Sequence, residues 1–182
     1  MISGPSGVGK GTVVAALRQR MPQVRVTVSA TTRAPRPGEV DGVHYHFLDD
    51  AAFDALVESG GFLEWAMFAG NRYGTPWSSV EDARTADGPV VLEIEVQGAR
   101  QVRQRIPDAV LILLAPPSVQ ALAERLAGRG TDNVETVADR LRIAEWELAQ
   151  ADDFDHVVVN DLLDDAVEEI ARILGAAAPS PP

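Results

Sequence analysis

Hydrophobic residues recur along the chain with two different periods, and stretches of the two kinds alternate from one end to the other. Apolar and β-branched runs between turn residues predict strands, whereas apolar positions three and four residues apart predict helices. The predicted strands are 24–29, 43–48, 61–66, 89–95, 109–114 and 156–159. The predicted helices are 12–20, 51–59, 96–105, 118–126, 134–151 and 162–174. Such alternation is typical of an α/β fold.

The run 109–114 is apolar throughout and lies between helical segments, as in a parallel strand that is buried on both faces. We therefore predict a doubly wound parallel sheet as the core of one domain over 1–175, built from 1–29 and 89–175. Between them, about 30–88, the strands are shorter and more polar, which indicates a small mixed α+β insertion. The Ala/Pro-rich tail 176–182 is expected to be disordered. Because only three residues precede the first glycine, we expect the natural start to lie upstream.

Composition narrows the class of protein. The sequence holds 16 basic and 27 acidic residues, a net charge of -11, and such a surface disfavours binding to nucleic acid. It has no cysteine and no apolar run of the roughly 20 residues that a membrane span requires, and it does not open on a basic segment followed by an apolar one, so we do not expect secretion. We therefore expect a cytoplasmic protein without a membrane or nucleic-acid partner. The sequence leaves the oligomeric state open.

The basic residues are fifteen arginines and one lysine, Lys10. A single lysine in an arginine-rich chain indicates a need for a compact ammonium group at that position. It ends the motif Gly4-Pro5-Ser6-Gly7-Val8-Gly9-Lys10, which fits the pattern G-x-x-x-x-G-K. In that pattern, glycines let backbone N–H groups surround a phosphate at a helix N-terminus, and the lysine reaches the β- and γ-phosphates. The alternative is a glycine-rich turn with a solvated lysine; the spacing and the helical pattern that follows favour the phosphate loop.

The general motif places a Mg²⁺-ligating hydroxyl directly after the lysine, but here Gly11 intervenes and the first hydroxyl is that of Thr12. Thr12 is accordingly the candidate metal ligand in the loop. No Asn-Lys-x-Asp motif for reading guanine in a GTPase is present. A kinase for a small molecule remains, with Mg²⁺ and arginines neutralising the transferred phosphoryl group.

A second candidate site follows the predicted strand 24–29. Arg33 and Arg36 are three residues apart in a segment stiffened by prolines, which suits a bidentate grip on a phosphate dianion. Downstream, Tyr45 can donate a hydrogen bond to the same phosphate.

Four further motifs follow these two sites along the chain. They are Phe62-Leu63-Glu64-Trp65-Ala66, Tyr73-Gly74-Thr75, Glu93-Ile94-Glu95-Val96-Gln97-Gly98 and Gly128-Arg129-Gly130-Thr131. With them the chain resembles guanylate kinase, a P-loop nucleoside monophosphate kinase, over nearly its whole length. The resemblance implies that ATP, with Mg²⁺ as cofactor, phosphorylates GMP, and dGMP as well, giving ADP and GDP in purine nucleotide metabolism. It also implies a helical lid at about 126–142.

The resemblance assigns roles to individual positions. For GMP it implies Arg33, Arg36 and Tyr45 at the phosphate, with Ser29, Glu64, Tyr73, Thr75 and Glu95 around the rest of the nucleotide. For ATP it implies residues 4–12, from Gly4 to Thr12, and Asn160 near the adenine. The catalytic residues would be Lys10, Arg36 and three lid arginines, Arg125, Arg129 and Arg140.

The chemistry of guanine agrees with these roles. Guanine presents the N1–H and N2–H₂ donors beside the O6 acceptor, so the carboxylate of Glu64 can accept from the donors. Adenine presents the opposite pattern and would leave that carboxylate unpaired. Glu95 stands where the family often has Asp, one methylene shorter, which bears on its reach to N2.

Other polar residues admit ordinary explanations. Glu93 could orient Mg²⁺-bound water or pair with a local arginine, and both interpretations stay open. His44 and His46 are better explained as structural or surface residues than as a metal pair. Arg100, Arg103, Arg105 and Arg142 are expected to be solvated or paired with acids.

Two other functions compete with a GMP kinase. A related P-loop kinase could act on a phosphorylated sugar, which would not require Ser29, Glu64 and Thr75. A non-catalytic module with the same fold could instead bind phosphorylated protein partners through the arginine-rich segment. Such modules lose nucleotide-handling residues, whereas Lys10 and the lid arginines are present here.

Overall fold

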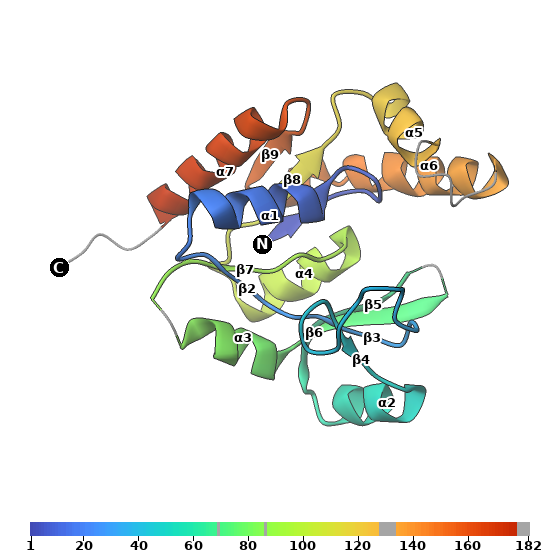
Figure 1. Ribbon diagram of the computed structural model, residues 1–182, viewed down its shortest axis with the longest axis vertical. Helices are drawn as coiled ribbons and strands as arrows, with labels where there is room; N and C mark the ends of the chain where they lie inside the picture. The colour runs from blue at the N-terminus through green and yellow to red at the C-terminus, as the bar shows by residue number, and fades with distance from the viewer. Residues whose placement is uncertain (69, 86, 128–133, 178–182) are drawn as a thin grey trace. The chain divides into compact units, whose positions relative to one another are not determined.

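The computed structural model describes residues 1–68, 70–85, 87–127 and 134–177, with the backbone alone for 134–137 and 177. The chain forms two compact units, one from residues 1–22 and 110–177 and the other from residues 23–109 (Figure 1).

The first unit is a parallel sheet with helices. Its strands β1 (Ile2–Ser3), β8 (Ile112–Ala115) and β9 (His156–Val159) pair in the order β1-β8-β9. Both pairings are parallel, with Ile112 in register with Ile2 on one side and with His156 on the other. The helices are α1 (Lys10–Arg20), α5 (Val119–Ala127), α6 (Val134–Leu148) and α7 (Leu163–Ala177), with a 3₁₀ turn at Ala151–Asp153. A parallel α/β core is confirmed.

The core of this unit follows from the apolar run seen in the sequence. All four residues of β8 are buried, and so are apolar side chains of β1, α1 and α7. The helix α5 begins where the hydroxyl of Ser118 accepts a hydrogen bond from the N–H of Ala121 at 3.0 Å, as an N-cap does. It packs against α6 through Leu122, Leu126 and Ala144.

The second unit holds two sheets. The strands β2 (Arg25–Val26) and β7 (Val90–Val91) form a parallel pair. The strands β3 (Ala30–Thr31), β4 (His46–Phe47), β5 (Phe62–Phe68) and β6 (Asn71–Pro76) pair in the order β4-β3-β6-β5. Because β3 is parallel to β4 and antiparallel to β6, the sheet is mixed, as predicted. The helices are α2 (Asp50–Glu58), α3 (Trp77–Arg84) and α4 (Val96–Arg105), shown in Figure 1.

Aromatic residues form a small core under the mixed sheet. Phe53 of α2 and Phe62 of β5 are buried, with ring centroids 4.5 Å apart, and Trp65 packs against them. Asp49 begins α2 by accepting a hydrogen bond from the N–H of Ala52 at 2.8 Å. The packing fixes the helix against the sheet that carries the candidate GMP residues.

The structure differs from the sequence predictions at several points. The chain divides after Pro22 and after Ala109, whereas the sequence placed the ends of the insertion near 30 and 88. The strands β2 and β7 pair with each other and fall in the second unit. The helix α7 reaches Ala177, two residues into the predicted tail, because alanine favours helix. None of the described helices is long and apolar enough to cross a membrane.

Candidate functional site

The glycines of the motif 4–10 allow the loop to pass close to neighbouring backbone. Gly4 has a φ of 150°, and a Cβ there would lie 2.3 Å from the carbonyl oxygen of Leu114 at the end of β8. Gly9, the N-cap of α1, has a φ of 99° in the left-handed region. A side chain at either position would strain the loop, so the turn from β1 into α1 depends on glycine.

Lys10 is the first residue of α1, and its ammonium group bends back over the loop. Its Nζ donates to the carbonyl of Gly4 at 2.5 Å, so the positive charge lies at the mouth of the loop. Thr12 is exposed on the first turn of the same helix, where its hydroxyl is available to a ligand. A loop that ends in N–H groups, a helix N-terminus and an ammonium suits a polyphosphate.

The back of the loop is held by two of the predicted residues. Asn160 is buried, and its Nδ2 donates to the carbonyl of Val8 at 2.8 Å. Arg125 donates from Nη2 to the carbonyl of Asn160 at 2.8 Å and from Nη1 to that of Val8 at 3.4 Å. The structure therefore places Arg125 and Asn160 together against the loop.

The other two predicted lid arginines are less fully placed. Arg140 lies on α6 and is partly buried. Arg129 and the rest of the motif 128–131 lie outside the described residues, and the lid as a whole stays a prediction.

In the second unit, Arg33 and Glu39 form a bidentate ion pair. The two guanidinium nitrogens of Arg33 lie 2.8 and 3.0 Å from the carboxylate oxygens of Glu39. The hydrogen bond from Arg33 lowers the pKa of Glu39 to about 2, and the backbone N–H of Arg36 also donates to that carboxylate, at 2.6 Å. No role was predicted for Glu39; its position six residues after Arg33 and three after Arg36 was the available signal.

Two tyrosines border this ion pair. The guanidinium of Arg33 lies 5.5 Å from the ring centroid of Tyr45, and the rings of Tyr45 and Tyr73 meet edge to face at 6.0 Å. Burial raises the pKa of the Tyr45 phenol, and the negative charge of Glu93 adds to this. The phenol therefore stays protonated at neutral pH, as a hydrogen-bond donor to phosphate must be.

The carboxyl group of Glu64 is a second strongly perturbed acid of this unit. Glu64 is 4% exposed, and its Oε1 accepts from the hydroxyl of Thr75 at 2.7 Å. Burial raises its pKa to about 7, and the nearby charge of Glu95 contributes to the rise, although the hydrogen bonds from Thr75 oppose it. A strongly perturbed buried carboxyl beside a hydroxyl is a typical feature of a recognition site.

The remaining predicted residues lie in the same unit. Ser29 precedes β3, and its carbonyl accepts from the N–H of His46 at 2.8 Å. The Arg36 side chain is exposed. Glu93 and Glu95 are partly buried in the segment that leads into α4, and both act electrostatically on Tyr45. Every predicted GMP residue therefore belongs to the second unit, and every described ATP residue belongs to the first.

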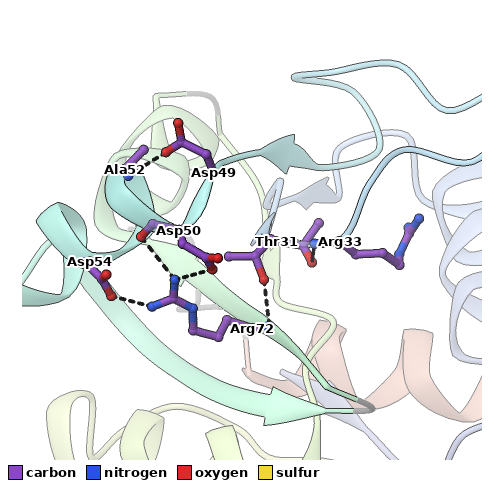
Figure 2. A network of polar contacts seen from close by, with 8 residues as sticks. Thr31, Arg33, Asp49, Asp50, Ala52, Asp54 and Arg72 are labelled. Carbon is purple, nitrogen blue, oxygen red and sulfur yellow. Dashed lines mark hydrogen bonds and ion pairs between the residues drawn. The ribbon is translucent and has the colours of Figure 1, made fainter.

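Arg72 was not predicted, yet it fixes the strand that carries Tyr73 and Thr75 (Figure 2). Its guanidinium binds Asp54, and it also binds Asp50 at 2.6 Å, both on α2. Its backbone N–H donates to the hydroxyl of Thr32 at 3.0 Å. The arginine thus connects β6 to α2 and to the chain just after β3.

Two of the arginines expected to be solvated or acid-paired also donate hydrogen bonds to backbone carbonyls. Arg103 donates to the carbonyls of Pro107 at 3.0 Å and Ala109 at 2.9 Å, after the end of α4. Arg105 donates to the carbonyl of Phe62 on β5. Arg142 does pair with an acid, Asp139. Because every residue has a main-chain carbonyl, the sequence gives no signal from which these contacts could be predicted.

Among the described residues, no three His, Asp or Glu side chains gather in a way that could hold a metal ion. His44 and His46 have other partners, since His44 Nδ1 accepts from the N–H of Val40 at 2.9 Å and His46 Nε2 lies 3.4 Å from the hydroxyl of Ser79. A Mg²⁺ ion that arrives on a nucleotide keeps phosphate and water ligands and needs few from protein. The exposed hydroxyl of Thr12 fits that requirement.

A parallel sheet whose first strand leads through a glycine loop and a lysine into a helix is typical of the class of P-loop nucleotide-binding proteins. Comparison with known proteins identifies the family. The guanylate kinase family model matches residues 1–177. The guanylate kinase of Synechococcus sp. (strain CC9311) is 55% identical over 173 residues, which cover 94% of this chain and 90% of that protein.

A second relative and a solved structure indicate the same family. The guanylate kinase of Thermobifida fusca (strain YX) is 53% identical over 180 residues, covering 99% of this chain and 91% of that protein. The crystal structure of guanylate kinase from Anaplasma phagocytophilum matches with a TM-score of 0.76 and 31% identity, covering 96% of this chain and 82% of that one. The chain belongs to the guanylate kinase family, whose reaction is the transfer of a phosphoryl group from ATP to GMP.

Proposed function

We propose that this chain catalyses the family reaction with the residues predicted above, each unit handling one nucleotide. On the donor side, the loop from Gly4 to Thr12 binds the phosphates of ATP. Lys10 neutralises charge on the β- and γ-oxygens, and Asn160 lies on the adenine side. The contacts of Arg125 and Asn160 with the Val8 carbonyl support this assignment, because they hold the loop in the conformation that a phosphate needs.

On the acceptor side, Arg33, Arg36 and Tyr45 bind the phosphate of GMP, with Tyr73 beside them. The ion pair with Glu39 orients the guanidinium of Arg33 before substrate arrives, which lowers the entropic cost of binding. The protonated phenol of Tyr45 supplies a neutral donor. dGMP carries the same base and phosphate and is a substrate by the same contacts.

Glu64, Thr75, Ser29 and Glu95 read the guanine. The carboxylate of Glu64 accepts from N1–H and N2–H₂, while hydroxyl groups donate to O6. The buried Glu64–Thr75 pair, 2.7 Å apart, is the observation that carries the proposal, because a kinase for phosphorylated sugars would not need a buried acid at this position. A base without these donors would leave the acid desolvated and unpaired.

The reaction itself needs no protein nucleophile. A phosphate oxygen of GMP attacks the γ-phosphorus of ATP in line, the bond from that phosphorus to the β–γ bridging oxygen breaks, and ADP leaves with the bonding pair. Lys10 and the arginines Arg36, Arg125, Arg129 and Arg140 offset the charge that spreads over the transferred group. When bound with ATP, Mg²⁺ neutralises the β- and γ-oxygens; Thr12 would offer it one oxygen, and Glu93 is the second candidate.

The substrates place the reaction in purine nucleotide metabolism, and we assign it to the cytoplasm. The deciding experiment is a coupled assay of ADP release with MgATP and the acceptors GMP, dGMP, AMP, UMP, CMP and ribose bisphosphate. We expect turnover with GMP and dGMP far above the rest. Preference for the sugar phosphate would contradict the reading of guanine, and folded protein without turnover on any acceptor would indicate a binding module.

A further inference from the structure

We propose that one face of α4, made by Gly98, Gln101 and Arg105, positions the guanine-reading carboxyl. The proposal rests on the proposed function and adds three specificity-determining positions to it. Their spacing of three and then four residues puts them on the same side of a helix. The helix packs against β5, the strand that carries Glu64 (Figure 1).

The register between β5 and β6 is irregular next to Glu64, the residue that carries the carboxyl. The pairing with β6 shifts between Phe62 and Glu64, as it does where a bulge adds one residue to a strand. Phe62, Leu63 and Glu64 are consecutively buried, although side chains of a regular strand alternate between faces. The irregularity therefore turns the acid inward, and something must hold the strand in that register.

Two side chains of α4 hold it on either side of the irregularity. Arg105 donates to the carbonyl of Phe62 on one side. On the other side, the amide of Gln101 binds the backbone of Trp65 twice, accepting from its N–H at 3.3 Å and donating to its carbonyl at 2.7 Å. β5 is the last strand of its sheet, so its outer backbone groups need such partners, and Gln101 supplies them as a neighbouring strand would.

Gly98 makes the room in which the carboxyl lies. A Cβ at this position would be 2.3 Å from Oε2 of Glu64 and 3.0 Å from its Cδ. The atoms it would meet belong to the end of a side chain, so an added methyl would displace the acid rather than the backbone. Alanine is otherwise favourable inside a helix.

The groups that act on the Glu64 carboxyl come from β6, from α4 and from the segment just before α4. Thr75 of β6 donates to it, while Glu95 before α4 and Arg105 within α4 act on it with opposite signs. The same helix thus carries the space for the acid, the side chains that bind its strand, and a positive charge that acts on the acid. A carboxyl group whose position is fixed in this way can discriminate between bases that differ by one exocyclic group.

The test compares Gly98→Ala with Gly175→Ala, a helical glycine of α7 around which nothing lies within 4 Å. We expect Gly98→Ala to raise KM for GMP about tenfold or more, with KM for ATP unchanged and no loss of thermal stability. Gly175→Ala should change neither KM. The ratio of kcat/KM for GMP to that for IMP, which lacks the 2-amino group, should fall in Gly98→Ala.

A second pair of variants tests the binding of β5 by Gln101. Gln101→Leu removes both hydrogen bonds to Trp65, and Gln104→Leu makes the same change at an exposed position of the same helix. Only the first should raise KM for GMP and lower the GMP to IMP ratio. Unchanged GMP constants in both Gly98→Ala and Gln101→Leu would overturn the inference, and so would equal losses for ATP and GMP.

Calorimetric titration of the wild-type chain with GMP separates this inference from the proposed function. Wild-type protein that binds GMP without turnover contradicts the proposed reaction, while the same variants still test α4 through binding. Wild-type protein that does not bind GMP contradicts both. Normal turnover of GMP by the wild type and by both variants contradicts the inference alone.

Discussion

The two units are built for recognition in different ways. In the first, the candidate ATP site is mostly backbone: three glycines with positive φ and the N-terminus of α1, with Lys10 and Asn160 bound to carbonyls of the loop itself. In the second, the candidate GMP site is mostly side chains: an arginine held by Glu39, two tyrosines and a buried acid. A phosphate is the same in every nucleotide, and backbone can bind it; a base must be distinguished, which requires side chains aimed at particular atoms.

The largest expected effect comes from replacing Lys10, the lysine that ends the glycine loop of the first unit. Lys10→Ala should lower kcat about a hundredfold or more, because the ammonium stabilises charge that develops on the transferred phosphoryl group. KM for GMP and thermal stability should hardly change. The control is Arg18→Ala, at an exposed position of the same helix. A Lys10→Ala variant with wild-type kcat in the ADP-release assay would remove Lys10 from the mechanism.

The matching change in the second unit is Glu64→Gln. It keeps the shape but places an N–H₂ where guanine offers its own donors, so kcat/KM for GMP should fall about tenfold to a hundredfold. KM for ATP should be unaffected, because the described ATP residues lie in the first unit. Steady-state kinetics with each substrate varied in turn measures both. A parallel rise of both KM values would contradict the division of labour between the units.

The pH dependence of GMP binding sharpens the comparison further. The pKa of Glu64 is about 7 in the folded protein, above its ordinary value of 4.5, so the folded state holds this proton. Its contribution to stability is therefore complete below pH 4.5 and is lost as pH rises through about 7.

In the proposed function GMP binds the carboxylate form of Glu64, so KM for GMP should fall about tenfold between about pH 6 and pH 8, as the ionised fraction of Glu64 rises. KM profiles of wild type and Glu64→Gln measure this change, which only the wild type should show. The same slope in both proteins would assign the titration to another group.

The smallest expected effects, on stability and on KM for ATP, come from replacing one glycine in each unit. Gly60→Ala changes a residue with a φ of 67° and open space around it, and should cost about 1 kcal/mol of unfolding free energy. Gly9→Ala adds a contact of 2.8 Å with Nδ2 of Asn160 to the same strain, and should cost more and also raise KM for ATP. Chemical denaturation and ATP kinetics of both variants measure the difference. Equal costs and an unchanged KM would show that the loop tolerates a side chain.

Much of the first unit could be predicted because its signals are local. The motif from Gly4 to Lys10 and the apolar run that becomes β8 each depend on neighbouring residues alone. In the second unit, β3, β6 and α3 were not predicted. β6 contains Asn71, Gly74 and Pro76, poor strand formers, and pairing with β5 and β3 overrides their preference. α3 is short and polar, and it has neither a side-chain cap nor an acidic first turn.

The sequence by itself determined which residue types stand at which spacing: a glycine loop that ends in one lysine, an arginine pair, and an acid to which the family resemblance assigns the reading of guanine. These are choices of residue type at short spacing, and type and spacing are visible in a sequence. Tertiary structure alone decided how the acid is held, because Gly98 and Gln101 meet β5 from more than thirty positions away along the chain. The pKa of Glu64 rises only when distant segments pack around its carboxyl group, and Gly98 makes room for that group only in the packed structure. A local sequence pattern does not show which segments will pack together.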